Sequence, residues 1–357
     1  MSASEPRDAP TVLELGARGR HRAAAFALAG RTCVRSDAGA LWNEWTLAFD
    51  DGRVGYLAEA MGAFTLLFEA PIAPPFAALE IERPLETGFV VVERGHATRI
   101  GSFGRAPEAP RRYLYADLSS AAGERATIDY GAGQGGRAAR PEVFVGQRVA
   151  LAEVGLRPRA ARARFFPAPA GPIPEDLDLW LDVGDEGELP SPLDIDGPCA
   201  RVRVLGVMHR SIRVDGERYA WEEYALHAPA EGLRWLVVAD GQPSIVDGVE
   251  PGEVHAPQDV TKATFRGQAF RLVSSGKARV EWATGELPWP VAIGDVSSAR
   301  DYARGAHVLS REATDDEVAW SFGTQVEPEM IARAFGKSVP PEPRARAAKP
   351  PRTPKRR

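Results

Sequence analysis

Cysteine is scarce in this chain of 357 residues, where only Cys33 and Cys199 occur. Two cysteines exclude a disulfide framework and a zinc site with four cysteine ligands. Long apolar runs are also missing, since no stretch approaches the roughly 20 apolar residues that a membrane-spanning helix needs. The first ten residues, MSASEPRDAP, lack the apolar segment of a signal peptide. We therefore predict a cytoplasmic protein without a membrane span.

Basic charge is not in excess either. Lys and Arg number 44 against 49 Asp and Glu, which gives a formal net charge of −5. Proteins whose folded part binds nucleic acid usually present a basic surface, so specific nucleic-acid binding is not expected. The six histidines show no metal-site spacing, and no G-x-S-x-G motif is present. The sequence thus indicates no cofactor, metal or catalytic residue, and it leaves open whether the chain is an enzyme.

What the sequence does contain is an internal repeat. Residues 40–62, ALWNEWTLAFDDGRVGYLAEAMG, align without a gap to residues 219–241, YAWEEYALHAPAEGLRWLVVADG. A second match joins residues 89–107 to residues 270–288. A third match joins the short stretches ATIDYG (126–131) and VAWSFG (318–323). Because the matches occur in the same order, two copies of one domain are predicted.

Composition marks the segments around the two copies. Residues 170–197 contain nine acidic residues, no Lys or Arg and several prolines, which is typical of an exposed linker. Strict alternation in DLDLWLDV (176–183) predicts one additional edge strand there. The predicted organisation is a disordered N-terminus (1–15), copy one (16–150), an acidic proline-rich linker (151–197), copy two (198–337) and a basic disordered tail (338–357).

Within a copy, apolar and polar residues alternate with the period of a strand. Short runs are separated by Asp51-Gly52 and Met61-Gly62, and glycine accepts the positive φ of tight hairpin turns. Each copy should therefore open with a three-stranded meander. Residues 326–336 are the best helical stretch, with Pro328 in the first turn and Gly336 at the end. The predicted class is mainly β, two tandem sandwich-like or barrel-like domains with a short C-terminal helix.

A W-x-E-[WY] element recurs at residues 42–45 and 221–224. In a strand, Trp42 and Glu44 share one face, and Trp45 lies on the other. Aromatic neighbours can desolvate a carboxylate and raise its pKa, as acid–base chemistry requires. In the alternative interpretation, which the duplication favours, each carboxylate accepts structural hydrogen bonds. The candidate ligand-binding residues are Trp42, Glu44, Trp45, Glu59, Trp221, Glu223, Tyr224 and Trp235. Glu59 is unique to copy one, because copy two has Val238 there.

The joint pattern of WNEWTLAFDDGRVGYLAEAMG, WEEYALHAPAEGLRWLVVADG, GELPWPVAIGD and LSREATDDEVAWSFG resembles a bacterial family, domain of unknown function 4178. The resemblance covers both copies and leaves out the linker and the tail. Relatives often carry a zinc ribbon with cysteine ligands. This sequence lacks the cysteines that such a ribbon needs. The resemblance also implies gene neighbours similar to aminopropyltransferases, decarboxylases and small membrane proteins. Such neighbours imply a link to polyamine metabolism or to an envelope-stress system.

Two functional hypotheses follow. The favoured one is a non-catalytic binding or scaffold protein with a protein partner, since a duplicated β domain can present two similar faces. The alternative is an enzyme or accessory protein of polyamine metabolism that binds a cationic ligand near Glu44 or Glu223, because carboxylates and aromatic rings both attract cations. Separately, eight Lys and Arg against one Glu from residue 337 onward predict weak, salt-dependent contact of the tail with anionic surfaces.

Overall fold

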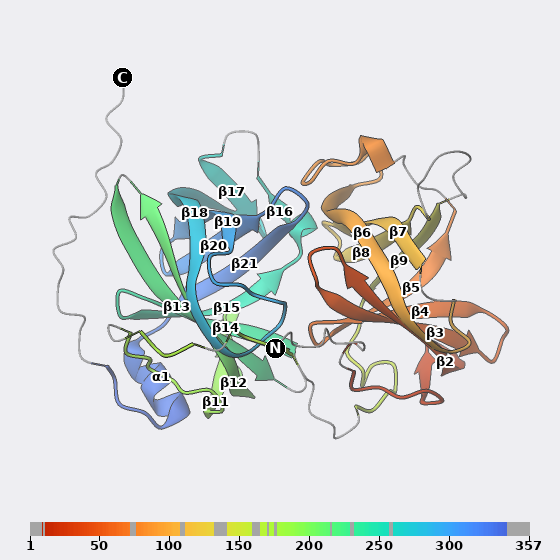
Figure 1. Cartoon of the computed structure of the whole chain (residues 1–357), viewed down its shortest axis with the longest axis horizontal. Coiled ribbons are helices and arrows are strands. Elements are labelled where there is room, and N and C mark those ends of the chain that lie inside the picture. Colours follow the sequence, from red (N-terminus) through yellow and green to blue (C-terminus); the bar gives the residue numbers. More distant parts are fainter. Residues whose placement is uncertain are drawn as a thin grey trace.

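Two β-barrels follow one another in the chain and lie side by side, copy two on the left and copy one on the right in Figure 1. The predicted mainly-β class is confirmed. The sequence left open whether each domain is a sandwich or a barrel, and both domains are barrels. The computed structural model describes residues 9, 11–71, 76–107, 111–131, 141–158, 165–169, 171–174, 177–214, 216–228, 232–256 and 260–340. Most of the predicted N-terminal segment (1–15) and most of the basic tail lie outside the described residues.

Copy one is a closed barrel of eight antiparallel strands, β2 to β9. The strand order is β1-β2-β3-β4-β5-β9-β8-β7-β6, and pairing of β2 with β6 closes the ring and leaves β1 outside. A 3₁₀ turn, η1 (Phe76–Ala78), follows β5. The strands are β1 (Arg18–His21), β2 (Ala24–Ser36), β3 (Leu41–Phe49), β4 (Val54–Ala60), β5 (Ala63–Ala70), β6 (Phe89–Gly104), β7 (Arg111–Ser120), β8 (Glu124–Asp129) and β9 (Glu142–Arg148).

Copy two repeats this topology, with β12, β13, β14, β15, β21, β20, β19 and β18 around the ring and a closing β12–β18 pair. Short strands flank it: β10 and β17 pair with β18, β16 with β17, and β11 with β12. The elements are β10 (Phe166–Pro167), β11 (Glu186–Ser191), β12 (Asp194–Val214), β13 (Glu217–Ala228), β14 (Gly232–Ala239), β15 (Gln242–Val249), η2 (Pro251–Glu253), β16 (Val254–His255), β17 (Lys262–Phe265), β18 (Gln268–Leu287), β19 (Val296–Arg304), β20 (His307–Ala313), β21 (Val318–Gln325) and α1 (Pro328–Phe335).

The predicted meanders are confirmed as β3–β4–β5 and β13–β14–β15. The turn between the second and third strand has two residues of positive φ in both copies. Met61 and Gly62 have φ of 49° and 75°, and Asp240 and Gly241 have 50° and 76°. Two such residues make the turn whose twist matches that of the flanking strands, and glycine carries its second position without strain.

Two predictions from the pattern are wrong. Residues 126–131 were matched to residues 318–323, but β8 occupies the position of β20 in the ring, and β9 occupies that of β21. The alternation in DLDLWLDV does not make a strand in its described part, residues 177–183. There Trp180 and Leu181 are buried against the outside of barrel two. The strands β11 and β12 begin within the stretch assigned to the linker.

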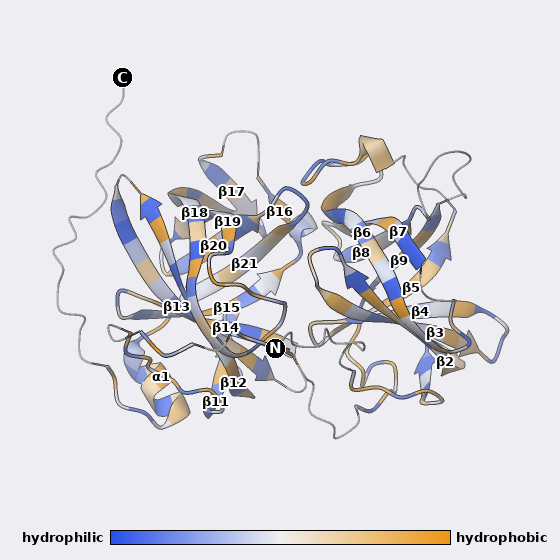
Figure 2. Ribbon diagram, in the orientation of Figure 1, coloured by the Kyte–Doolittle hydropathy of each residue, from blue (hydrophilic) through white to orange (hydrophobic). Residues whose placement is uncertain are grey.

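The hydrophobic cores lie mainly on the outer faces of the barrel walls. In copy one, Trp45 and Leu47 of β3 pack against Leu13 and Val154, which belong to segments outside the ring. In copy two, a similar wall packs against residues 177–181 and the helix α1. Figure 2 shows the alternation of hydrophilic and hydrophobic residues along the strands. The alternate residues therefore face the barrel interiors, and many of them are polar.

The helix α1 confirms the predicted C-terminal helix. Pro328 opens its first turn, and Gly336 ends it in the left-handed conformation with φ of 64°. Ile331, Ala332 and Phe335 form its buried stripe. The ring of Phe335 lies against Gly187 of β11, where a Cβ atom would come within 2.9 Å of Phe335. This close approach explains why glycine occupies that strand position.

At the contact between the two barrels, each barrel contributes a glutamate that accepts hydrogen bonds from the other barrel. Glu82, which follows η1 in copy one, accepts hydrogen bonds from Arg311 Nε (2.8 Å) and from Trp320 Nε1 (3.2 Å) of copy two. Glu250, just before η2 in copy two, accepts from Arg125 Nη2 of copy one at 2.6 Å. Both glutamates lie in the connection that follows the equivalent strands β5 and β15. These contacts tie the copies to one another.

Candidate functional site: the polar barrel interiors

The Trp–Glu pair of copy one faces the barrel interior. Glu44 Oε1 accepts hydrogen bonds from Trp42 Nε1 (3.2 Å) and from the hydroxyl of Tyr113 (3.3 Å). Tyr113 lies on β7, which does not neighbour β3 in the ring, so this contact spans the interior. The ring of Trp42 packs against that of Tyr115, with centroids 5.7 Å apart.

An ion pair completes this interior site. Arg99 Nη2 lies 2.9 Å from Asp129 Oδ2, and the two side chains are only 8% and 6% exposed. The guanidinium of Arg99 lies over the ring of Tyr113, 5.0 Å from its centroid. Burial raises the pKa of Glu44, and the positive charge of Arg99 offsets part of that rise. The interior site of copy one therefore combines Glu44, Asp129 and Arg99 with the aromatic side chains of Trp42, Tyr113 and Tyr115, and the hydroxyl of Tyr115 also donates to Glu93.

Copy two has an equivalent site. Trp221 Nε1 donates to Glu223 Oε1 at 2.6 Å, as Trp42 does to Glu44. Arg210 Nη1 donates to Glu223 Oε1 at 3.0 Å and to Glu312 Oε1 at 2.6 Å. Its Nη2 donates to Glu312 Oε2 and to Ser297 Oγ, both at 2.9 Å. Since β12 and β20 are not neighbours in the ring, these bonds also cross an interior.

Strand register shows that the arginine has changed strand between the copies. In copy one, Val34 of β2 pairs with Trp42 on one side and with Arg99 of β6 on the other. In copy two, Arg210 of β12 pairs with Trp221 on one side and with Val280 of β18 on the other. A valine and an arginine have thus exchanged places across one strand pair. The cation reaches the same interior from either strand.

The second carboxylate occupies the same register position in both copies. Asp129 pairs with Tyr115 of β7, which pairs with Gly95 of β6. In copy two, Glu312 pairs with Ala299 of β19, which pairs with Gly276, the counterpart of Gly95 in the sequence alignment. The two interiors therefore share a tryptophan, two carboxylates and an arginine.

The copy-two interior has more acid than base. Burial raises the pKa of Asp301, the charge of Glu312 adds to the rise, and a hydrogen bond from Ser310 (2.7 Å) opposes it. Burial also raises the pKa of Glu223. For Glu312 the effect of burial is outweighed by Arg210, which holds its pKa below the usual value. The Glu312 side chain is 39% exposed, whereas Arg210 is 7% exposed, so solvent reaches this end of the site.

One donor of each arginine lacks a partner. Nε of Arg99 and Nε of Arg210 are buried without a hydrogen-bond acceptor in the described part of the chain. A buried donor of this kind is ordinarily satisfied by water or by a ligand. Both interiors thus have hydrogen-bonding capacity that the described side chains leave unused.

The other candidate residues do not join these sites as a group. Trp45 and Glu59 lie on the outer face of barrel one, and Tyr224 lies on that of barrel two, where its hydroxyl accepts from the amide of Trp180 at 2.9 Å. Trp235 packs against Trp289, with ring centroids 5.5 Å apart. The structure brings together Trp42 with Glu44 and Trp221 with Glu223, and it places Trp45, Glu59 and Tyr224 on the opposite face of the barrel walls. Trp235 pairs with Ala225 and therefore shares the interior face of Glu223.

Glu59 is the centre of a structural network. Its Oε2 accepts from Trp45 Nε1 (2.9 Å), Asn43 Nδ2 (3.2 Å) and Thr11 Oγ1 (2.6 Å). Its Oε1 accepts from the amide of Val12 at 2.9 Å. The carboxylate therefore fastens residues 11–12 to the outside of barrel one. Val238 occupies this position in copy two and belongs to the apolar outer core.

We expect Glu59→Ala to lower the free energy of unfolding by about 3 kcal/mol, because it leaves buried donors without an acceptor. Urea denaturation measures this loss. Glu124→Ala is the control, since Glu124 is exposed on the same barrel and its loss should cost under about 0.5 kcal/mol. Equal stability of the two variants would contradict the structural role of Glu59.

Sequence reasoning missed Arg99, Asp129, Arg210, Asp301 and Glu312. A signal was present for Arg210, which directly follows the largely apolar stretch VLGVMH (204–209) of β12. A charged residue beside such a stretch suggests a buried partner.

Metal binding has no comparable support, because among the described residues no group of three or more His, Cys, Asp or Glu is placed to hold a metal ion. No helix in the described part of the chain has the length and apolarity to cross a membrane.

Comparison with protein families identifies one segment. Residues 200–328 match the model of DUF4178, a domain of unknown function. The match spans most of barrel two and does not include copy one, so the expected resemblance of both copies is shown for one of them. No curated protein matches the chain, and no solved structure does. The likeness of copy one to copy two rests on their common strand order.

Proposed function

We propose that this chain is a non-catalytic binding protein whose barrel interiors take up the ammonium group of a small organic amine. The single observation that carries the proposal is the equivalent interior site in both copies, with Glu44 beside Trp42 and Glu223 beside Trp221. Barrels of eight strands have interiors of the size that holds side chains or one small ligand.

Charge favours a cationic ligand. In copy two, Glu223, Asp301 and Glu312 surround the single guanidinium of Arg210. In copy one, Glu44 and Asp129 face Arg99, and Asp117 adds a further carboxylate at the register position that Asp301 holds in copy two. A bound ammonium group compensates the excess carboxylate, and the indole faces add a cation–π contribution. Polyamines are the amines that the sequence resemblance implies, and they are the natural first probes.

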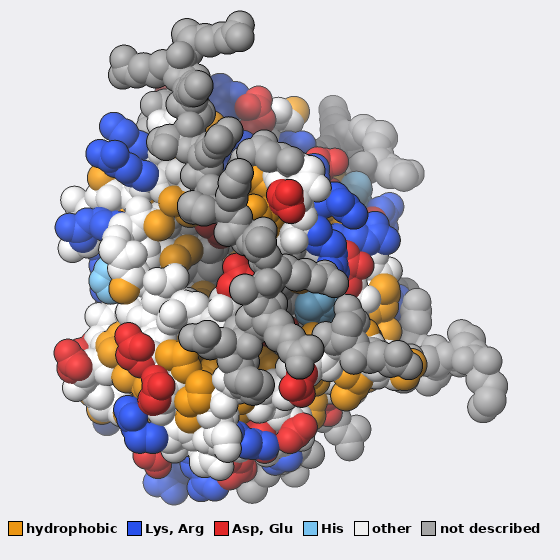
Figure 3. Space-filling view, turned by 90° about the vertical axis from the view of Figure 1, so that its left-hand side faces the viewer, with side chains coloured by type: hydrophobic (Ala, Val, Ile, Leu, Met, Phe, Trp, Pro, Cys, Tyr) orange, Lys and Arg blue, Asp and Glu red, His pale blue; other side chains and the backbone are white. Residues whose placement is uncertain are grey.

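The protein-partner hypothesis concerns a different surface. Trp42 with Glu44, and Trp221 with Glu223, face the interiors, so they support a small ligand better than a protein. On the side of copy two seen in Figure 3, basic, acidic and apolar side chains are interspersed. A partner protein, a scaffold role and a link to polyamine metabolism stay predictions.

Calorimetric titration with spermidine and with the uncharged 1,4-butanediol tests the proposal. We expect binding of spermidine alone, and a weakening of about tenfold in Glu223→Gln or Asp301→Asn, because each removes a buried charge from the site. Glu44→Gln should remove the contribution of copy one. Glu188→Gln, which removes an exposed charge from β11, is the control.

Two results would contradict the amine proposal. One is the absence of spermidine binding at millimolar concentration. The other is equal affinity of the wild type, Glu44→Gln, Glu223→Gln and Asp301→Asn, once circular dichroism has shown that the variants are folded.

A further inference from the structure

A separate hollow lies at one end of barrel one. It has a volume of about 400 Å³ and is lined by His21, Arg22, Arg53, Val54, Phe68 and Glu69. The lining residues come from the β1–β2 hairpin, the β3–β4 hairpin and β5. None of them belongs to the interior sites described above. Volumes of this order are typical of small-molecule sites.

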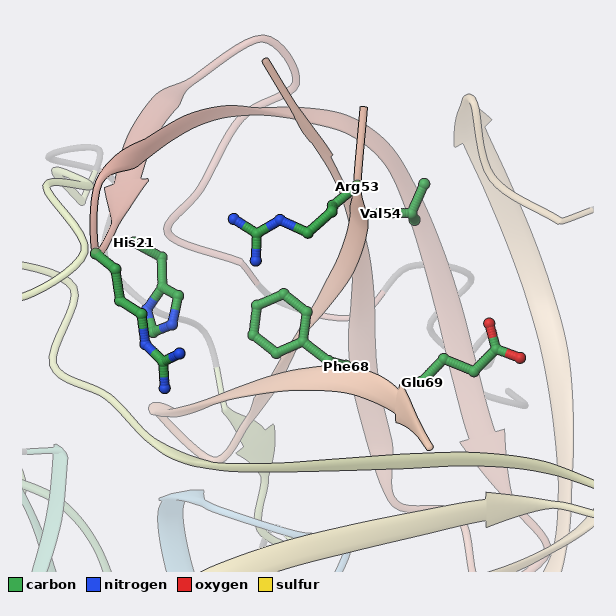
Figure 4. A pocket seen from close by; sticks show the side chains of 6 residues that line it. His21, Arg53, Val54, Phe68 and Glu69 are labelled. Carbon is green, nitrogen blue, oxygen red and sulfur yellow. The ribbon is translucent and has the colours of Figure 1, made fainter. Parts of the chain in front are cut away.

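The side chains around this hollow separate by charge. In Figure 4, the guanidinium of Arg53 extends over the ring of Phe68 toward His21, while the carboxylate of Glu69 points away from this space. The rings of His21 and Phe68 lie 5.6 Å apart and form an aromatic floor. The hollow therefore presents nitrogen donors above an apolar base.

Two arginines leave donor capacity free here. Arg53 uses Nε and Nη2 for Asp51, both at 2.8 Å, and its guanidinium lies over the ring of Phe49, 4.9 Å from the centroid; its Nη1 has no hydrogen-bond acceptor among the described residues. Arg22, at the hairpin tip with φ of 55°, has no carboxylate partner in that part of the chain. Burial lowers the pKa of His21, and the charges of Arg22 and Arg53 lower it further. Both arginines thus act on the same imidazole.

We propose that this hollow binds the phosphate group of a small phosphorylated metabolite. A phosphate offers several acceptor oxygens and negative charge, which suit guanidinium donors better than a single carboxylate does. Phe68 and His21 supply a face for a planar group attached to the phosphate. One class of ligand with both features is a nucleoside monophosphate.

Protonation of His21 should couple to binding. The charged groups that face it are Arg22 on its own hairpin, Arg53 and Asp51 on the β3–β4 hairpin, and Glu69 on β5. Only the arginines oppose its positive charge. A bound phosphate dianion offsets them, so His21 takes up a proton more readily in the complex. By linkage, the affinity for the phosphate dianion rises as the pH falls through the range in which His21 titrates.

Titration calorimetry with inorganic phosphate, AMP and adenosine tests this site on the full chain. We expect AMP to bind most tightly, phosphate more weakly and adenosine not at all. Arg53→Gln and Arg22→Gln should each weaken AMP by about tenfold, the effect of one charge-assisted hydrogen bond. Arg18→Gln removes the same charge from an exposed position outside the hollow and should change affinity less than about twofold.

The ¹H–¹⁵N resonances of the His21 ring give an independent readout, because AMP should shift them and raise the midpoint of their titration. Equal loss of affinity in Arg18→Gln, Arg22→Gln and Arg53→Gln would show adsorption to general positive charge and overturn the proposal. Absence of AMP binding at millimolar concentration would overturn it too. Equal affinity for AMP and phosphate would refute the nucleoside monophosphate as ligand.

Discussion

Arg210→Val is expected to lower the free energy of unfolding of copy two by about 3 kcal/mol. Arg210 is 7% exposed and is the cation between Glu223 and Glu312. Its removal leaves Glu223, whose side chain is 13% exposed, with the indole of Trp221 as its one remaining hydrogen-bond donor among the described residues. Glu312 is 39% exposed and is partly solvated by water, which keeps the expected loss at the lower end of the range for broken buried ion pairs.

The exchange between the copies supplies a rescue for this variant. Arg210→Val combined with Val280→Arg rebuilds in copy two the arrangement of Val34 and Arg99 in copy one. We expect the double variant to recover at least about half of the loss, whereas Val280→Arg alone places a second cation beside Arg210 and destabilises. The coupling energy of the double-mutant cycle should be favourable by roughly 1–3 kcal/mol.

Urea denaturation of the four proteins measures this coupling. Arg213→Val, at an exposed position of the same strand, controls for the change in β propensity and should cost under about 0.5 kcal/mol. Simple addition of the two single losses would contradict the idea that the interior needs one arginine from either strand.

The strands and their turns could be predicted because they depend on local chemistry. Met61-Gly62 and Asp240-Gly241 adopt the positive φ angles that the turn requires. Alternation also predicted which residues share a face, and Trp42 and Glu44 do lie together. Closure of the sheet was not predictable from the same pattern, because a polar residue inside a barrel alternates as a polar residue on a solvent-facing strand does.

The site was predictable only in part for a related reason. Trp42 and Glu44 are two residues apart in one strand, whereas Arg99 and Asp129 reach them from strands joined by the barrel closure. Long-range register also explains why the match of residues 126–131 to residues 318–323 was wrong. The strands β8 and β21 resemble one another in sequence but hold different places in the ring. Glu59 was singled out because copy two lacks it. Its role depends on residues 11–12, a contact that no periodic pattern encodes.

A second large effect is expected from pH at the contact between the copies. Glu93 of copy one and Glu317 of copy two form an isolated antiparallel bridge, and the amide of Arg94 donates to the carbonyl of Asp316 at 3.0 Å. Burial raises the pKa of Glu93 from 4.5 to about 8, and the charges of Asp117 and Glu317 contribute to the rise. Burial also raises the pKa of Asp117. Protonation is therefore what allows these carboxyls to lie together.

The sign of the effect follows from proton binding. Near neutral pH the folded chain holds a proton on Glu93 that the unfolded chain has released, because the pKa is about 8 when folded and 4.5 in its ordinary state. This contribution to stability is fully present below pH 4.5 and is lost as the pH rises through 8. We expect the free energy of unfolding to fall by about 2 kcal/mol between pH 5.5 and pH 8.5, which corresponds to roughly 5 °C in Tm.

Glu93→Gln should remove most of the fall in the free energy of unfolding between pH 5.5 and pH 8.5, because glutamine keeps the size of the carboxyl but does not titrate. At pH 8.5 the variant should be more stable than the wild type, because it carries no charge at a position where burial disfavours one. Glu86→Gln, an exposed substitution in the same copy, should retain the slope of the wild type. Thermal unfolding of the three proteins at pH 5.5, 7.0 and 8.5 decides the matter. An unchanged slope in Glu93→Gln would assign the pH dependence to other groups and would remove Glu93 from the electrostatics of the contact between the copies.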